Sequence, residues 1–278
     1  MRNREHERIS HGVTAKQPIR FMVDEWMTIG PGKRDMHFEV ELGFVLEGRM
    51  QRESSTHCLE LQAGDIWCNG IWEPHSAYVR KSPLRLAILH LYPPYLANLS
   101  LPEQPDLNWL APFTDHPERR PQGAILSSDT FQEITSRLSS AQCAVTLHLD
   151  ALQALWQIIS RWKCQAPYRI TSSDIGRLET ALKLVFDNPR LVTIGEAASA
   201  CHMSRNGFNL FFQRVMGVTF AQFALHHRLS QAASDLVETD DPIKQIADRW
   251  GFTDASHFHR CFRAIFKALP SDYRRGDY

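Results

Sequence analysis

The sequence lacks clustered cysteines, long apolar runs and an excess of charge of either sign. Its six cysteines are scattered, with no C-x-x-C pair, which favours reduced thiols over a disulfide framework. No apolar run approaches the ~20 residues that a membrane-spanning helix needs, so no membrane association is expected. No apolar segment follows the charged residues at the N-terminus, so we expect no secretory signal and a cytoplasmic protein.

The charge balance excludes a protein that binds nucleic acid through bulk positive charge. Lys and Arg number 31, Asp and Glu also number 31, and the formal net charge is zero. The stretch from Asp174 onward contains 13 basic and 12 acidic residues. Any DNA-binding surface must therefore come from segregation of charge on one face. We expect weaker non-specific DNA binding than a polybasic protein would show.

The chain, at 278 residues, is long enough for two domains with separate cores. Its first part predicts short strands, because apolar or alternating runs are separated by turns at 42–46, 59–62, 66–68 and 84–91. This pattern is typical of a β-sandwich or a small barrel. Prolines are dense from Tyr92 to Pro121, which predicts an extended connector.

The rest of the chain predicts helices. Ser128 and Asp129 can cap a helix that reaches about Ser140. The next helix has one broad apolar face, made of Leu149, Leu152, Leu155, Trp156, Ile159 and Trp162. We expect this face to pack against the strand domain or against a second copy of the chain, so the helices between about Asp129 and Cys164 predict a homodimer.

Capping signals divide the last hundred residues into further helices. We expect helices to begin at four capping residues, Ser173, Thr193, Thr219 and Asp241. Pro242 would then occupy a first helical position. Asn188-Pro189 and Gly251 mark two helix ends.

One helix-turn-helix pattern occurs twice in this region. The matching pairs are Ile194 and Ile243, Ala198 and Ala247, Cys201 and Trp250, Ser204 and Asp254, Phe208 and Phe258, Phe212 and Phe262, and Phe223 and Tyr273. The offset grows from 49 to 50 residues after Cys201, so the second copy has one extra residue in its turn. A repeat of this size is one supersecondary unit used twice. A helix, a tight turn and a second helix with a polar face enter the major groove of DNA. We therefore expect two consecutive groove segments to be read.

Each copy predicts a recognition helix with an aromatic core face and a polar outer face. The core faces hold Phe208, Phe211, Phe212 and Val215 in the first copy and Phe258, Phe262, Ile265 and Phe266 in the second. We expect DNA contacts from the outer faces and their neighbours: Arg205, Asn206, Asn209, Leu210, Gln213, Arg214, Lys244, Ala255, Ser256, His259, Arg260 and Arg263.

The residue types on the outer faces suit the edges of bases. Asn can pair with adenine through two hydrogen bonds, Leu can rest on a thymine methyl group, and Arg260 is best suited to guanine. Arg214, Lys244 and Arg263 are expected to contact phosphates, which position the protein without specifying sequence. The alternative is a set of ordinary amphipathic helices with solvated outer faces. The repetition of cap and aromatic core favours DNA binding over that alternative.

These residues carry a resemblance to a known family. The stretch Ile194-Gly-Glu-Ala-Ala-Ser-Ala, the pair Arg228-Leu229 and above all Ile243-Lys-Gln-Ile-Ala-Asp-Arg-Trp-Gly-Phe-Thr-Asp-Ala-Ser-His-Phe-His-Arg-Cys-Phe resemble the AraC/XylS family of bacterial transcription regulators. The resemblance covers residues 191–274. It implies that a long helix from Phe220 to about Glu238 joins two subdomains, and that a cupin-type sensor barrel precedes them.

Two stretches of the first part match the cupin motifs in part. Glu41 to Gly48 matches E-x6-G, and Gly64-Asp65 with Pro74-His75 resembles the second motif. The resemblance implies a metal site made of Asp35, His37, Glu41 and His75. Imidazole with carboxylate oxygen suits Zn, Fe or Mn. Alternation places Asp35, His37, Glu39 and Glu41 on one face of one strand.

The alternative for this face is direct binding of an organic effector without a metal. The expected effector-binding residues are His37, Glu39, Glu41, Trp72 and His75. Tryptophans stack on sugars or aromatic molecules, and either class of effector fits. Trp26 and Trp67 are expected in the core instead.

The sequence therefore predicts an α+β protein with a cupin-like sensing domain at 1–122, a helical linker and dimerisation segment at 123–170, and a DNA-binding domain with two helix-turn-helix subdomains at 171–278. We expect a transcription regulator, not an enzyme, that acts as an activator with RNA polymerase as partner. Its effector would alter how the recognition helices are presented. The alternatives are a metal-dependent cupin enzyme fused to a DNA-binding domain, and a scaffold whose helices bind protein.

Overall fold

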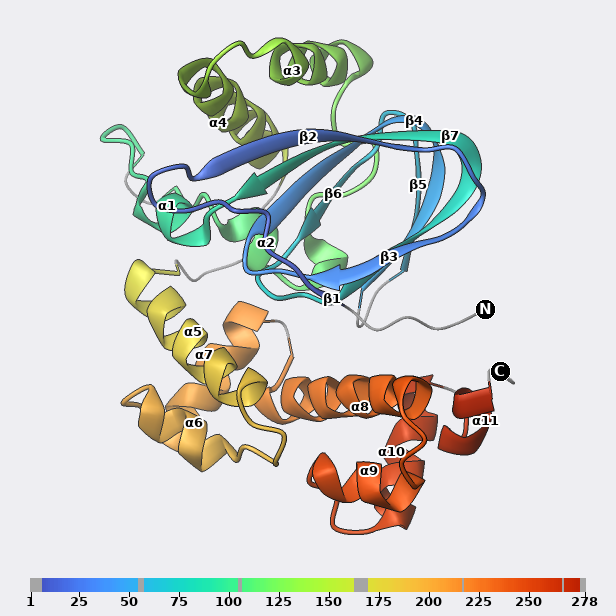
Figure 1. Cartoon of the computed structure of the whole chain (residues 1–278). Coiled ribbons are helices and arrows are strands. Elements are labelled where there is room, and N and C mark those ends of the chain that lie inside the picture. Colours follow the sequence, from blue (N-terminus) through green and yellow to red (C-terminus); the bar gives the residue numbers. More distant parts are fainter. Residues whose placement is uncertain are drawn as a thin grey trace. The chain divides into compact units, whose positions relative to one another are not determined.

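The computed structural model describes residues 7–54, 58–104, 107–162, 170–216, 218–266 and 268–275 (Figure 1). The strands are β1 (Glu7–Arg8), β2 (Ile19–Trp26), β3 (Gly30–Met36), β4 (Val40–Ser54), β5 (Cys58–Gln62), β6 (Ile66–Asn69) and β7 (His75–Leu91). The helices in the first part are α1 (Pro93–Asn98), α2 (Ala111–Thr114), the 3-10 helix η1 (Pro117–Arg119), α3 (Ser128–Ser140) and α4 (Ala144–Arg161). Those in the second part are α5 (Ser172–Phe186), α6 (Ile194–Ala200), α7 (Arg205–Met216), α8 (Phe220–Glu238), α9 (Ile243–Arg249), α10 (Ala255–Phe266) and α11 (Pro270–Arg275).

The chain divides into two compact units. The sheet unit holds the described residues up to Ile175 together with Val215 and Met216, and the helical unit holds the others from Gly176 onward. The α+β fold class is confirmed, with a strand-rich first part and a helical second part. The likeness to a cupin rests on the motif residues alone. Cys164, the predicted end of the dimerisation segment, lies outside the described residues.

The two long strands β4 and β7 organise the sheet. They pair antiparallel from Val40 opposite Leu91 to Ser54 opposite His75. The first half of β7 also pairs with β3, and its second half pairs with β2. Strands β5 and β6 add to β4, so the sheet curls around an apolar interior (Figure 1). That interior holds Val45, Met50, Leu61, Trp67, Val79, Leu84, Leu86 and Ile88.

Gly48 allows the sheet to bend at the second end of the E-x6-G motif. The register between β4 and β7 shifts on both sides of this residue, which has a φ of +88°. A Cβ atom at Gly48 would lie 2.4 Å from the carbonyl oxygen of Pro83 and 2.7 Å from that of Lys81. Only glycine fits both the left-handed backbone and the close approach. This motif glycine therefore has a structural role.

The predicted extended connector from Tyr92 to Pro121 is wrong, because the segment contains α1, α2 and η1. Each of these short helices carries a proline in its first two positions, where a missing N–H breaks no helical hydrogen bond. Leu110 and Phe113 are fully buried, so the segment contributes to the core. The prolines mark helix starts here.

Helices α3 and α4, predicted as part of a linker, belong to the sheet unit. The ring of Phe131 on α3 lies 5.9 Å from that of Phe44 on β4, measured between centroids. Leu155 of α4 is buried, whereas Leu149 remains 63% exposed. The cap of α3 is Ser127, whose hydroxyl accepts from the N–H of Thr130, one residue before the predicted cap.

The helical unit contains two helix-turn-helix pairs, α6 with α7 and α9 with α10 (Figure 1). Helix α8 lies between them in the chain, as predicted. The cap of α5 is Thr171 rather than Ser173, because Thr171 and Asp174 exchange hydrogen bonds between their side chains and backbone N–H groups. Pro242 is the N-cap of α9 and not its first residue. These shifts are one or two residues, the usual uncertainty of a helix end.

None of the described helices combines the length and the apolar character needed to cross a bilayer. The five cysteines within the described ranges are free thiols.

Candidate functional site

The first helix-turn-helix is fixed by a cap, a tight turn and an aromatic core. Thr193 and Glu196 form the predicted capping box at the start of α6. Helix α6 ends at a turn in which His202 has a φ of 54°. The hydroxyl of Ser204 then accepts from the N–H of Gly207 and caps α7. Phe208 and Phe212 are fully buried and orient the helix.

The second helix-turn-helix repeats this construction. Gly251 has a φ of 70° at the position that corresponds to His202. The carboxylate of Asp254 accepts from the N–H of His257 at 2.6 Å and caps α10. Phe258 and Phe262 are fully buried.

The repeat is confirmed at the level of ring contacts. The centroids of Phe208 and Phe212 are 5.8 Å apart, and those of Phe258 and Phe262 are 5.4 Å apart. Each second phenylalanine then meets the ring that closes its copy: Phe212 meets Phe223 at 5.7 Å, and Phe262 meets Tyr273 at 5.2 Å.

The extra residue of the second copy lies in its turn. The N–H of Met203 donates to Ala198, and that of Phe252 donates to Ala247, so the two turns match up to this point. Helix α7 begins two residues after Met203, whereas α10 begins three residues after Phe252. Thr253 is therefore the insertion.

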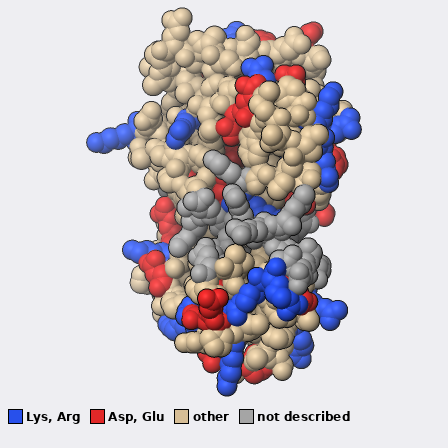
Figure 2. Space-filling model, turned by 45° about the vertical axis from the view of Figure 1, so that its right-hand side comes forward, with Lys and Arg blue, Asp and Glu red and all other residues tan. Residues whose placement is uncertain are grey.

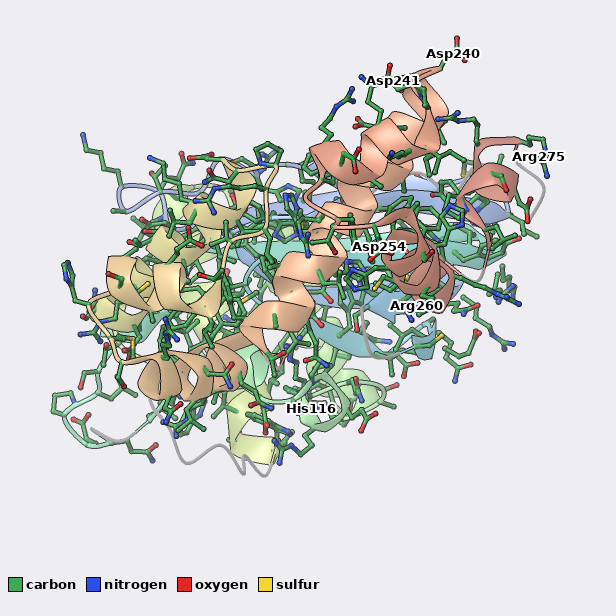
Figure 3. The ribbon with its side chains drawn as sticks, turned by 90° about the horizontal axis from the view of Figure 1, so that it is seen from below. His116, Asp240, Asp241, Asp254, Arg260 and Arg275 are labelled. Carbon is green, nitrogen blue, oxygen red and sulfur yellow. The ribbon has the colours of Figure 1, made fainter. Side chains whose placement is uncertain are left out.

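The outer faces of α7, α9 and α10 carry the predicted DNA-contacting residues. Nine side chains are exposed: Arg205, Asn206, Leu210, Gln213, Arg214, Lys244, Ser256, Arg260 and Arg263. Three are half-buried: Asn209, Ala255 and His259. Figure 3 labels Arg260 on α10, with Asp254 at the start of that helix. The twelve residues thus form the solvent side of the two copies, with the aromatic core behind them.

The surface charge of this region is mixed, in line with the zero net charge of the chain. Figure 2 shows basic and acidic side chains interspersed over the face in view. Several cations are engaged within the protein: Arg249 pairs with Asp235 at 2.8 Å, and Arg190 with Glu196 at 2.8 Å.

Helix α8 holds the second turn through two residues that the sequence did not single out for this role. Arg228 Nη1 donates to the carbonyl oxygens of Trp250 and Gly251, both at 3.1 Å, and its guanidinium lies 4.7 Å from the ring of Phe252. Asp235 accepts from Trp250 Nε1 at 2.8 Å. Cationic donors at a helix C-terminus satisfy its free carbonyls. These contacts fix the angle at which α9 leads into α10.

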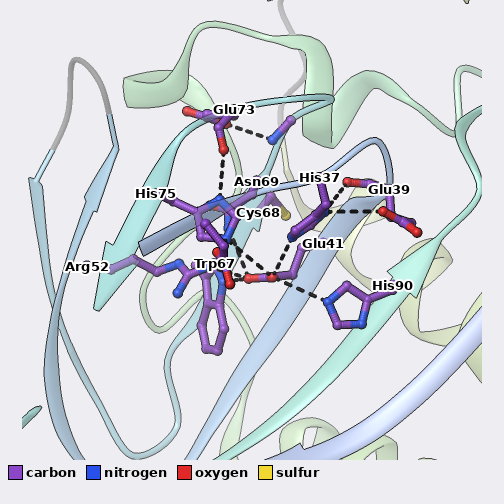
Figure 4. Close-up of polar contacts among 12 residues, drawn as sticks. His37, Glu39, Glu41, Arg52, Trp67, Cys68, Asn69, Glu73, His75 and His90 are labelled. Atoms are coloured by element: carbon purple, nitrogen blue, oxygen red, sulfur yellow. Dashed lines mark hydrogen bonds and ion pairs between the residues drawn. The ribbon is translucent and has the colours of Figure 1, made fainter. Parts of the chain in front are cut away.

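The sheet unit contains a second polar centre, built around Glu41 (Figure 4). One carboxylate oxygen, Oε1, accepts from Trp67 Nε1 at 2.6 Å, from Asn69 Nδ2 at 2.9 Å and from Arg52. The ring of Trp67 packs directly against Gly43, where an added Cβ atom would come within 1.9 Å of that ring. Trp67 is in the core, as predicted, but its indole N–H donates to Glu41 and so belongs to the polar centre.

Three histidines surround the other oxygen of Glu41, Oε2. The Nε2 atoms of His37, His75 and His90 lie 3.4, 3.8 and 3.6 Å from it. A fourth histidine, His11, stacks on His90 with ring centroids 3.4 Å apart. The sequence motifs did not indicate His11 or His90, because neither lies within them and only the pairing of β7 with β4 places His90 opposite Glu41.

The prediction that Asp35, His37, Glu39 and Glu41 lie on one face of a single strand is wrong. Strand β3 ends at Met36 and β4 begins at Val40, so His37 and Glu39 lie in the bend between them. The side chains of Asp35, His37 and Glu41 still meet, because the bend returns the chain toward the same interior. Trp72 is half-buried and has a φ of 51°. Its backbone N–H donates to the carbonyl oxygen of His37 at 2.8 Å.

Electrostatics in this centre follow from burial and from the close charges. Burial opposes ionisation of Glu41, but Arg52, His37 and His90 outweigh it and hold its pKa well below the ordinary value. Burial and then the neighbours His90 and His37 lower the pKa of His11 to about 3. Burial disfavours charge on His37 too, yet the Glu41 carboxylate raises its pKa.

Two groups of side chains have the spacing of metal ligands. Asp35, His37 and His75, three of the four predicted ligands, each offer one atom within 4.8 Å of the others, and so do His11, His37 and His90. In the first group both ring nitrogens of His75 are engaged, Nε2 with Asp35 Oδ1 at 2.7 Å and Nδ1 with the carbonyl of Glu73 at 2.8 Å. A metal there would have to displace the bond between His75 and Asp35.

A recess lies beside the polar centre. Among the residues that line it, Arg52, Trp67 and Asn69 also bind Glu41, while Glu73 and Arg120 pair with each other. None of the five predicted effector-binding residues lines this recess.

A model of the helix-turn-helix domain family matches residues 197–276. The probable transcriptional regulator LumQ of Photobacterium leiognathi is 24% identical over 133 residues, which are 46% of this chain and 54% of that protein. The transcriptional activator RhrA of Rhizobium meliloti is 38% identical over 85 residues, 30% of this chain and 27% of that protein. The chain thus matches about half the length of LumQ and less of RhrA.

Among solved structures, ToxT from Vibrio cholerae with bound unsaturated fatty acid is similar, with a TM-score of 0.49 and 12% identity, covering 92% of this chain and 95% of that one. The family model and the sequence relatives confirm that residues 197–276 form a helix-turn-helix domain of the type found in transcription regulators.

Proposed function

We propose that this chain, whose residues 197–276 match the helix-turn-helix domain family, is a sequence-specific DNA-binding transcription regulator of the AraC type, controlled by a small molecule. One observation carries the proposal: both copies bury equivalent aromatic rings and expose polar side chains on the opposite face. A helix held in this way can enter the major groove with its outer side chains against base edges.

The zero net charge shapes how DNA is recognised. Few phosphate contacts give weak non-specific binding, so base contacts must supply most of the discrimination. Asn206, Asn209 and Arg260 have the side-chain chemistry for adenine and guanine edges. Arg214, Lys244 and Arg263 position the protein on the backbone.

Selection of duplexes from a random pool by the purified chain tests DNA binding. We expect enrichment of a defined sequence, bound at least about 10³-fold more tightly than a scrambled duplex. Recovery of no sequence preference would contradict the proposal and would favour a scaffold that binds protein.

The sheet unit is proposed as the sensor. His37, Glu39, Glu41, Trp72 and His75 offer hydrogen-bonding groups and one aromatic surface to a sugar or an aromatic effector. An effector that prefers one arrangement of the protein shifts the population toward it. Such a ligand raises the melting temperature, so a thermal-shift screen of sugars and aromatic acids identifies the class. No stabilisation by any member of either class would contradict this assignment.

We further propose a cytoplasmic homodimer that acts as an activator together with RNA polymerase. Val145 and Leu149 on α4 are 68% and 63% exposed, which favours burial of this face against a second copy. Sedimentation of the full chain at micromolar concentration tests the dimer, and a monomer alone would contradict it.

The alternative function, a metal-dependent cupin enzyme fused to the DNA-binding domain, has one observation in its favour, the spacing of Asp35, His37 and His75. We propose instead that the protein is not an enzyme, because two of these candidate metal ligands, Asp35 and His75, are already paired with each other at 2.7 Å. Metal analysis and an activity assay of the wild type and of His75→Ala separate the two functions. The enzyme requires a bound metal and a catalytic activity in the wild type, and His75→Ala should abolish that activity.

A further inference from the structure

Three histidines from distant parts of the sheet unit meet at one point. His11 lies between β1 and β2, His37 lies in the bend before β4, and His90 lies near the end of β7. One ring nitrogen of each lies within 4.8 Å of the other two. We propose that His11, His37 and His90 bind a divalent transition-metal ion, for which Zn²⁺ is the best-suited probe. This site does not depend on the proposed DNA-binding function.

The histidines have buried nitrogens without hydrogen-bond partners. These are His11 Nε2, His37 Nε2 and His90 Nδ1, of which His37 Nε2 faces the carboxylate of Glu41 at 3.4 Å. Buried polar atoms normally have a partner, and three orphaned atoms in one cluster require an explanation. A cation that accepts all three lone pairs supplies it.

The second nitrogen of His37 is placed as it is in metal sites. His37 Nδ1 donates to the carbonyl of Glu39 at 2.8 Å, which leaves Nε2 with a free lone pair. His90 Nε2 faces the carboxylate of Glu41 at 3.6 Å, beyond hydrogen-bond distance, and His90 Nδ1 is buried without a hydrogen-bond partner. Metal-ligating histidines usually donate their other N–H to a carbonyl or a carboxylate, and this fixes their tautomer.

The segment before β2 is held so that His11 faces the other two rings. Glu39 Oε1 accepts from the N–H of His11 at 3.0 Å and from the hydroxyl of Ser10 at 3.3 Å. Arg20 donates to the carbonyl of His11 at 2.7 Å. A metal bound by His11 and His90 would therefore attach this segment to β7.

The ligand chemistry favours zinc over magnesium or calcium. Imidazole nitrogens suit Zn²⁺, Ni²⁺ and Cu²⁺, whereas Mg²⁺ and Ca²⁺ require oxygen. Zinc takes three histidines at about 2.0–2.1 Å and keeps a fourth position for water or another ligand. His11 and His90 are stacked with ring centroids 3.4 Å apart, so one of these two rings must turn before both lone pairs point at one ion.

This site is distinct from the one that the cupin motif predicts. The two share His37, but the motif site also uses Asp35, Glu41 and His75, and Nε2 of His75 is paired with Asp35. Substitution of residues that belong to only one of the two groups therefore tells them apart.

The experiment uses the full chain, freed of metal with a chelator and titrated with Zn²⁺ against a chromophoric competitor. We expect one ion per chain for the wild type and no binding of Mg²⁺. His11→Ala is the main variant, because this half-buried side chain lies outside the paired strands. Its affinity for zinc should fall by at least about tenfold, the loss that removing even an indirect partner of a metal ligand produces. His90→Gln should show the same loss.

His75→Ala is the matched control, because His75 lies in the same polar centre and only in the other group. It should bind zinc as the wild type does. Co²⁺ as a spectroscopic substitute should give a visible absorption band in the wild type and in His75→Ala but not in His11→Ala. Failure of the wild type to bind one zinc ion, or loss of binding in His75→Ala with none in His11→Ala, overturns the proposal.

Discussion

Glu41 shows how one residue balances the polar centre of the sheet unit. Its carboxylate is buried, and three donors bind a single oxygen of it. A buried charge is tolerated only when it is paired and hydrogen-bonded, and Arg52 provides both. The charge of Glu41 therefore compensates that of Arg52 inside the sheet.

Replacement of Glu41 tests this balance. Glu41→Gln leaves the guanidinium of Arg52 buried without its counter-ion, which should lower the free energy of unfolding by about 3–5 kcal/mol. Glu60→Gln is the control, because the pair between exposed Glu60 and Arg80 contributes at most ~1 kcal/mol. Urea unfolding of both variants measures the difference, and equal losses would contradict a central role for Glu41.

Arg260 is the residue at which base recognition is tested most simply. Arg260→Ala should weaken binding to the selected duplex by about 1–3 kcal/mol and weaken binding to a scrambled duplex much less. Arg85→Ala on β7, also an exposed arginine, should leave both affinities unchanged. Titration of labelled duplexes measures the affinities. Equal losses on both duplexes would make Arg260 a phosphate contact.

At the scale of the element, the two helix-turn-helix turns have the same left-handed backbone at equivalent positions but carry different residues there. Both helices end in a residue with left-handed backbone, His202 in one copy and Gly251 in the other. A non-glycine residue there costs about 1–2 kcal/mol. At Gly251 an added Cβ would also lie 2.8 Å from the backbone nitrogen of Leu191.

The turns therefore predict opposite effects of exchanging glycine. His202→Gly should raise the free energy of unfolding by up to about 1 kcal/mol, because the strain is released. Gly251→Ala should lower it by about 1–2 kcal/mol or more, because strain is added and the methyl group meets Leu191. Thermal unfolding of the two variants tests the signs. A stabilising Gly251→Ala would contradict this description of the turn.

The cap of α6 predicts a dependence on pH. The ion pair with Arg190 and the hydrogen bonds from Thr193 lower the pKa of Glu196 from 4.5 to about 2. Because the folded pKa is the lower one, the stabilisation is present above about 4.5 and is lost as the pH falls through about 2. Glu196→Gln should unfold at a lower temperature than the wild type at pH 7, and this difference should shrink as the pH falls through about 2. A difference that stays constant with pH would contradict the ion pair.

Local sequence predicts elements well where the signal is local. The capping boxes at Thr193 and Thr219 are present, and the repeat predicted both turns and the extra residue of the second. The connector before α3 was mispredicted because proline marks both loops and helix starts. The bend at His37 was missed since alternation continues across it in the sequence.

At the scale of the whole molecule, the sequence predicts one site better than the other. The outer faces of α7 and α10 follow from helical periodicity alone. The polar centre of the sheet unit depends on which strands pair: His90 meets Glu41 only because β7 pairs with β4, and His11 meets His90 through the segment before β2. Such long-range contacts leave no spacing in the sequence, and they account for the missed histidines.

The central claim is that each copy buries its aromatic rings and reads one groove segment with the opposite face. Base preference at every position of the selected duplex, compared among the wild type, an Asn206→Ala and Asn209→Ala double variant, and Arg260→Ala, tests it most directly. The two variants should lose preference in separate blocks about one helical turn, or 10 base pairs, apart. If both variants kept the wild-type preference at every position, the claim would be wrong.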